Sequence, residues 1–73
     1  MKLLNQLKKG EKAKINKVEC TGELKKRLTE MGVIKGAAVE VLKVAPLGDP
    51  IEISVKGYNL SVRKSEAKKI LVD

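Results

Sequence analysis

Over most of this chain, apolar and polar residues alternate in short stretches, and each such stretch predicts a β-strand. The stretches are residues 11–20, 37–44, 51–56, 60–62 and 70–72. In the first two, the apolar parity shifts part-way, after Lys17 and after Val41, which predicts a bulge or a sharp bend. Five short strands with such bends predict a mainly β fold, a small and partly open barrel.

Residues 21–32 have the period of a helix instead. Leu24, Leu28 and Met31 recur at i, i+4 and i+7 and form one narrow apolar stripe. Thr21 is the expected N-cap, and Gly32 stands where a left-handed C-terminal cap is expected. The sequence therefore predicts one short helix after the first strand.

Two further segments predict short helical turns. Residues 1–9 place leucines on one side of a helical turn or two, which Gly10 ends. Residues 64–69 have room for one helical turn before the last strand, with Ser65 as its expected cap.

Both prolines of the chain lie in one loop, Ala45–Pro50, between the second and third strands. Because proline has no backbone donor, the pair ends the hairpin ladder on both sides. Gly48 can take a positive φ, and Asp49 is expected to bond its own backbone in the turn. The stiffened loop holds Leu47 near its tip, where this side chain either folds back as a plug or is offered to a partner.

The next hairpin is expected to turn at Gly57–Tyr58, because a type II′ turn places glycine first. That turn would pair Val55 with Leu60 and Ile53 with Val62.

Composition limits the possible functions. The 73 residues suffice for one thin-cored domain, and with Tyr58 as the only aromatic residue the core must be aliphatic. Sixteen Lys and Arg against nine Asp and Glu give a net charge of +7, which favours acidic partners. The lone Cys20 fits a reducing compartment, and no apolar run suits a membrane span or a signal peptide. We therefore expect an intact cytoplasmic protein.

No catalytic constellation is present. The chain has no histidine, Cys20 has no obvious base, and no phosphate-binding loop occurs. Cys20, Met31 and Met1 do not form a spaced set of metal ligands. Cys20 is expected to be a half-buried residue at the start of the helix. The sequence predicts neither an enzyme nor a bound cofactor or metal.

The basic residues have two interpretations. Small barrels bind nucleic acid through such charge, but they usually add aromatic stacking platforms, and Tyr58 stands alone. The favoured interpretation is a solvated lysine face that keeps a small domain soluble.

Taken together, three segments resemble the FeoA domain: RLTEMGVIKG, VEVLKVAPLGDPIEI and LSVRKSEAKKI. The resemblance extends from Leu7 to Val72. It implies a single FeoA-like domain over residues 1–73 with an SH3-like barrel. It also implies a cytoplasmic accessory of bacterial ferrous iron uptake that works with FeoB, a membrane transporter with a cytosolic G-protein domain. Transition-metal binding is implied only at the level of the family.

We therefore expect an interaction module that docks on FeoB or regulates it, at the G-protein or membrane-proximal region of FeoB. We expect no membrane span in this chain and no nucleic acid among its partners. The expected contact surface combines the stiff loop with the basic helix face: Leu47, Gly48, Asp49, Lys25, Lys26 and Arg27. Three alternatives remain. They are a nucleic-acid-binding basic barrel, a free-standing metal binder, and a regulatory domain like the C-terminal module of repressors of the diphtheria-toxin-repressor type.

Overall fold

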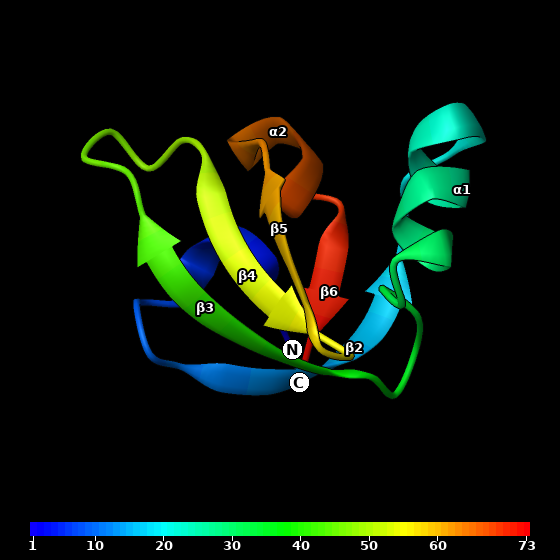
Figure 1. Cartoon of the computed structure of the whole chain (residues 1–73), viewed down its shortest axis with the longest axis horizontal. Coiled ribbons are helices and arrows are strands. Elements are labelled where there is room, and N and C mark those ends of the chain that lie inside the picture. Colours follow the sequence, from blue (N-terminus) through cyan, green and yellow to red (C-terminus); the bar gives the residue numbers. More distant parts are fainter.

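Six antiparallel strands form one strongly curved sheet in the computed structural model, which describes residues 1–73 (Figure 1). The strands are β1 (Lys2–Leu3), β2 (Lys12–Val18), β3 (Ala38–Val44), β4 (Ile51–Val55), β5 (Tyr58–Val62) and β6 (Ile70–Val72). Their order across the sheet is β1-β6-β2-β3-β4-β5. Because β1 and β5 do not pair with each other, the barrel stays partly open, as expected. The sixth strand is a correction to the predicted five.

The inward-facing side chains of the sheet supply most of an aliphatic core. All 16 buried residues are hydrophobic, and no polar or charged residue is buried. Strand β4 shows the alternation clearly, because Ile51, Ile53 and Val55 are buried while Glu52 is exposed. The core therefore follows the period-2 pattern that the sequence predicts.

Both predicted parity shifts correspond to irregular pairing. The β2–β6 register shifts between Ile15 and Lys17, and the β3–β4 register shifts between Val41 and Lys43. One extra residue at each place keeps the apolar side chains on the inner face while the strand bends.

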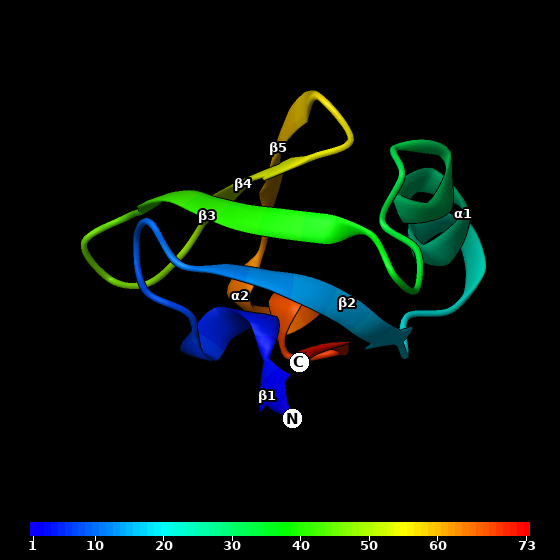
Figure 2. The same ribbon diagram turned by 90° about the horizontal axis from the view of Figure 1, so that it is seen from below.

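The helix α1 (Gly22–Glu30) follows β2 and stands at one end of the sheet (Figure 2). Leu28 is its one buried residue, while Leu24 and Met31 are half-buried, so the predicted stripe is confirmed in a graded form. Thr21 occupies the N-cap position, but its side chain makes no capping hydrogen bond. Gly32 has φ +91° and provides the expected left-handed residue after the helix.

The chain start and the second helix differ from the expectations. Residues 2–3 form β1 against β6, so the helical part shrinks to a 3₁₀ turn, η1 (Leu4–Gln6), with Leu4 fully buried. The helix α2 (Lys64–Ala67) is capped at Arg63 rather than Ser65. The reason is that Glu66 Oε1 accepts a hydrogen bond from the Arg63 N–H, at 2.8 Å.

The predicted turn of the β4–β5 hairpin was wrong by one residue. The turn consists of Lys56 and Gly57, with φ +52° and +81°, and Val55 pairs with Tyr58. Two positive φ values are typical of a type I′ turn, in which glycine comes second rather than first. The observed register pairs Ile51 with Val62, and both are buried.

Candidate interaction surface

The β3–β4 loop carries the most exposed large apolar side chain of the molecule. Leu47 is 90% exposed, so the interpretation of this residue as a plug is wrong. The loop is closed by two backbone hydrogen bonds, from the Ala45 N–H to the Pro50 carbonyl (3.2 Å) and from the Gly48 N–H to the Ala45 carbonyl (2.7 Å). The two prolines lie just outside β3 and β4, as predicted. The fold thus presents Leu47 to solvent on a short, internally bonded loop.

Asp49 ties this loop to α2. Its Oδ1 accepts a hydrogen bond from the Lys64 N–H at 3.0 Å, instead of bonding within its own turn as expected. The first N–H groups of a helix lack partners inside the helix, so a carboxylate there is favourable. The base of the loop is therefore joined to an element that follows it by 15 residues.

The basic side chains of α1 lie at the other side of α2. Lys25, Lys26 and Arg27 are all exposed, as predicted. Arg27 Nη2 lies 3.8 Å from Glu66 Oε2, and this ion pair joins α1 to α2. The Arg27 side chain is 64% exposed and that of Glu66 is 21% exposed, so solvent weakens the pair.

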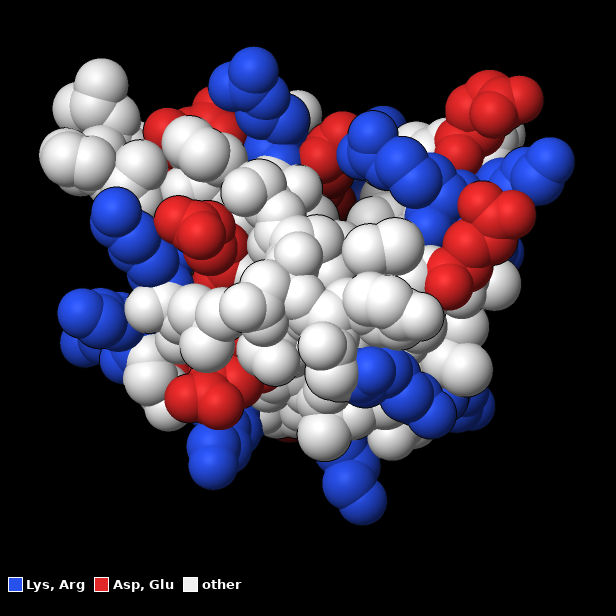
Figure 3. Space-filling view, viewed as in Figure 1, with Lys and Arg blue, Asp and Glu red and all other residues white.

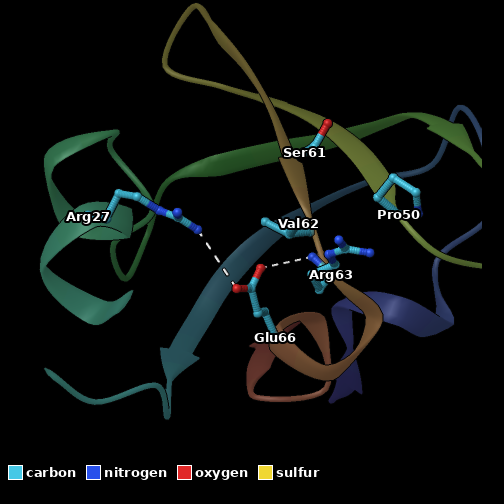
Figure 4. A pocket seen from close by; sticks show the side chains of 6 residues that line it. All are labelled: Arg27, Pro50, Ser61, Val62, Arg63 and Glu66. Atoms are coloured by element: carbon cyan, nitrogen blue, oxygen red, sulfur yellow. Dashed lines mark hydrogen bonds and ion pairs between the residues drawn. The ribbon is translucent and has the colours of Figure 1, made fainter. Parts of the chain in front are cut away.

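A groove of about 430 Å³ opens between α1, α2 and the end of β5 (Figure 4). Its lining is mainly polar: Arg27, Pro50, Ser61, Val62, Arg63 and Glu66. Glu66 divides its two oxygens between the Arg27 guanidinium and the Arg63 N–H. The Arg63 guanidinium has no carboxylate within 4.0 Å and is free to meet an acidic group.

The six predicted contact residues therefore form two groups rather than one patch. The loop with Leu47 and the helix α1 lie at opposite ends of the long axis, with α2 between them (Figure 1). Asp49 and Arg27 both contact α2, through Lys64 and Glu66. The sequence analysis did not assign Arg63, Lys64 and Glu66 to the site. The contacting pairs are 15 and 39 positions apart in the chain, and no local sequence pattern shows that such distant residues meet.

The middle of this face is uncharged. Figure 3 shows charged side chains of both signs around the rim and a region without charge between them, in the area of β5. Exposed Tyr58 and half-buried Leu60 belong to β5. An uncharged centre with a charged rim is typical of a protein contact surface.

Cys20 is fully enclosed, not half-buried as expected. It is 2% exposed, and its Sγ lies 4.0 Å from the Glu66 carbonyl oxygen. Burial raises the pKa of the Cys20 thiol above its ordinary value, the largest opposing influence being the charge of Lys69. A thiol of this kind is protonated at neutral pH and is a poor nucleophile and a poor metal ligand.

The structure contains neither a cluster of metal-ligating side chains nor a long apolar helix. No three residues among Cys, Asp and Glu come together in a way that could hold a metal ion, and the chain has no histidine. No helix has the length and apolar character needed to cross a bilayer.

Comparison with known families decides what this barrel is. The family model of the FeoA domain matches residues 2–73. The chain belongs to the FeoA family. A curated relative, the Fe(2+) transport protein A/Fe(2+) transporter FeoB fusion protein of Porphyromonas gingivalis, is 40% identical over 70 residues. That match covers 96% of this chain but only 8% of the relative, so the chain spans a small part of that protein.

Two solved structures show how closely the fold matches that of other FeoA proteins. The FeoA protein of Chlorobium tepidum is 39% identical, with a TM-score of 0.92 over 97% of this chain and 68% of that one. The FeoA of Stenotrophomonas maltophilia, solved in complex with zinc and described as an SH3 domain protein, is 30% identical. Its TM-score is 0.83 over 96% of this chain and 87% of that one.

Family membership confirms several predictions. The fold is SH3-like, and the family is linked to ferrous iron transport. The FeoA domain is a small accessory domain of transport and not an enzyme, in agreement with the sequence analysis. The S. maltophilia protein was solved with zinc, whereas this chain contains no group of three or more His, Cys, Asp or Glu side chains that could hold a metal ion.

Proposed function

We propose that this chain is a cytoplasmic interaction module that docks on FeoB and regulates ferrous iron uptake. The observation that carries the proposal is the P. gingivalis relative, in which a segment 40% identical to this chain is fused to the FeoB transporter. Fusion holds two modules at an effective concentration of roughly millimolar, which is useful when the separate modules bind one another weakly. Whether or not the two are fused, the contact itself has to form through the surface of the FeoA domain.

The structure supplies a surface suited to such a contact. Leu47 is an exposed apolar side chain on a short, internally hydrogen-bonded loop. Because the loop is already ordered, docking costs little conformational entropy. Lys25 and Lys26 extend from α1 and form no ion pair within 4.0 Å. They would steer an acidic partner toward the face, with a larger effect on the association rate than on affinity.

Calorimetry with the cytosolic part of FeoB from the same organism tests the proposal. Leu47→Ser should weaken binding about tenfold or more, since a buried leucine anchor contributes about 1.5–3 kcal/mol. The substitution should leave the fold intact. With Leu47 90% exposed, only about a tenth of that burial, roughly 0.2–0.3 kcal/mol, is present in the free protein.

Ile34→Ser is the matched control, because Ile34 is also an exposed aliphatic residue (42%) but belongs to the loop after α1. It should not change affinity for FeoB. Equal binding by the wild type and Leu47→Ser would exclude the loop from the interface. A complex whose affinity collapses between about 50 and 200 mM salt would indicate binding dominated by charge, as for nucleic acid.

A further inference from the structure

Strand β5 has one side without a hydrogen-bonding partner. Its only neighbour in the sheet is β4, and the turn makes Val55 and Tyr58 the first hydrogen-bonded pair. Along an antiparallel strand, residues whose backbone groups bond the neighbouring strand alternate with residues whose backbone groups point away from it. Leu60 therefore bonds β4, whereas the N–H and C=O groups of Asn59 and Ser61 point to the free side. Both of these residues are exposed, and neither joins any backbone hydrogen bond outside the sheet.

This edge lacks the features that normally protect one. Proteins discourage strand addition with charges, proline, bulges or very short edge strands. The other edge, β1, is two residues long and carries Lys2. Strand β5 has five residues in regular register, without charge or proline, in a chain of which 34% is charged. Strands β2, β3 and β4 all carry Lys or Glu, and β6, the other strand without a charge, is paired on both sides by β1 and β2.

The side chains of β5 suit an added strand as well. Tyr58, Leu60 and Val62 share one face, and their burial falls from fully buried Val62 to Tyr58 at 52% exposure. Figure 2 shows the turn end of this hairpin projecting from the rest of the molecule. A neighbouring strand would cover the apolar side chains that the open barrel leaves partly exposed.

Charge determines which kind of strand fits. The carboxyl end of β5 leads into the groove lined by Arg27 and Arg63, and the Arg63 guanidinium is unpaired. A second copy of this chain would bring another net charge of +7 to the same edge, which opposes self-pairing. A strand that carries carboxylates fits the charge of both the groove and the whole protein.

We propose that β5 accepts an extended segment of a partner protein as an additional antiparallel strand. The amino-terminal end of that segment carries carboxylates, which lie beside Arg27 and Arg63. Backbone hydrogen bonds to Asn59 and Ser61 provide the attachment, and the arginines select acidic sequences. The site does not depend on FeoB being the protein that supplies the strand.

The test uses a ten-residue peptide, acetylated and amidated, with two glutamates followed by alternating valine and threonine. In the free, ¹⁵N-labelled protein, the amides of Asn59 and Ser61 should exchange with solvent much faster than those of Leu60 and Val62. Adding the peptide should shift and protect the Asn59 and Ser61 amides selectively. A version with glutamines for glutamates should bind about two- to tenfold more weakly at low salt, as for one or two exposed ion pairs.

Two variants check that the backbone is what the peptide contacts. Asn59→Pro removes an outward-facing N–H, which an edge strand tolerates, and should weaken binding about fivefold or more. Asn59→Ala keeps the N–H and should bind like the wild type. If Asn59→Pro does not fold, the proposal is still tested in the wild type by whether the peptide selectively protects the Asn59 and Ser61 amides from exchange.

Three results would overturn the proposal. They are no binding of the peptide at 1 mM, amide shifts confined to other strands, and slow exchange of Asn59 and Ser61 in the free monomer. If sedimentation instead shows a dimer that protects the same two amides without peptide, the occupant is a second copy and the proposed acidic partner is wrong.

Discussion

Replacing Leu28 with alanine should remove most of what holds α1 to the barrel. Leu28 is 1% exposed and is the only fully buried residue of this nine-residue helix. A buried Leu→Ala substitution costs about 2–5 kcal/mol. The whole domain, at roughly 0.05–0.15 kcal/mol per residue, has about 4–11 kcal/mol of stability. The single substitution therefore removes between about a fifth and all of the free energy of unfolding of the domain.

Thermal and urea unfolding, followed by circular dichroism, measure this loss. For a domain of this size, a loss of about 3 kcal/mol lowers Tm by roughly 12–24 °C. Leu24→Ala should cost less, because Leu24 is only half-buried. Thr29→Ala, one residue along on the exposed side, should stay within about 0.5 kcal/mol. If Leu28→Ala melts within 2 °C of the wild type, Leu28 does not anchor α1 as described.

Three further predictions concern the thiol, the turn after α1 and metals. Cys20 should react with a thiol reagent far more slowly in the native protein than in denaturant, and equal reaction rates would contradict its burial. Because the pKa of the Cys20 thiol is raised in the folded state, its contribution to stability is complete below the unfolded pKa and is lost as pH rises through the folded pKa. In urea titrations, Gly32→Ala should lower the free energy of unfolding more than Gly10→Ala does. Both glycines have a positive φ, but only at Gly32 would an added Cβ meet another side chain, Lys56 Cγ at 2.7 Å. Equal losses of stability would show that Lys56 moves aside. Anaerobic calorimetry of the monomer should show no one-to-one ferrous iron or zinc site of micromolar affinity, and such a site would prove the ligand analysis wrong.

The sheet was predictable where one face of a strand is buried and the other is wet. Both bulges follow from parity, because a slip at Ile15 or Val41 would have turned apolar side chains outward. The β4–β5 turn was not predictable in the same way. Turns at Gly57–Tyr58 and at Lys56–Gly57 both keep the apolar alternation, and the choice depends on which pairs pack in the core.

The candidate surface was predictable only in its separate pieces. The sequence indicates a stiff loop around Leu47 and a basic helix, and both are present and exposed. Their connection through α2 depends on Asp49 meeting the Lys64 N–H and on Arg27 meeting Glu66. These contacts arise from the curvature of the sheet, which places α2 between the β3–β4 loop and α1 (Figure 1). Local patterns contain no information on that curvature.

The claim that this FeoA domain docks on FeoB through its stiff loop is tested most directly by NMR. The ¹⁵N-labelled chain is titrated with the unlabelled cytosolic part of FeoB from the same organism. The account predicts that the largest shifts fall on Leu47, Gly48 and Asp49, with smaller ones on Lys25 and Lys26. A spectrum unchanged at millimolar FeoB, or shifts that leave the loop untouched, would contradict it.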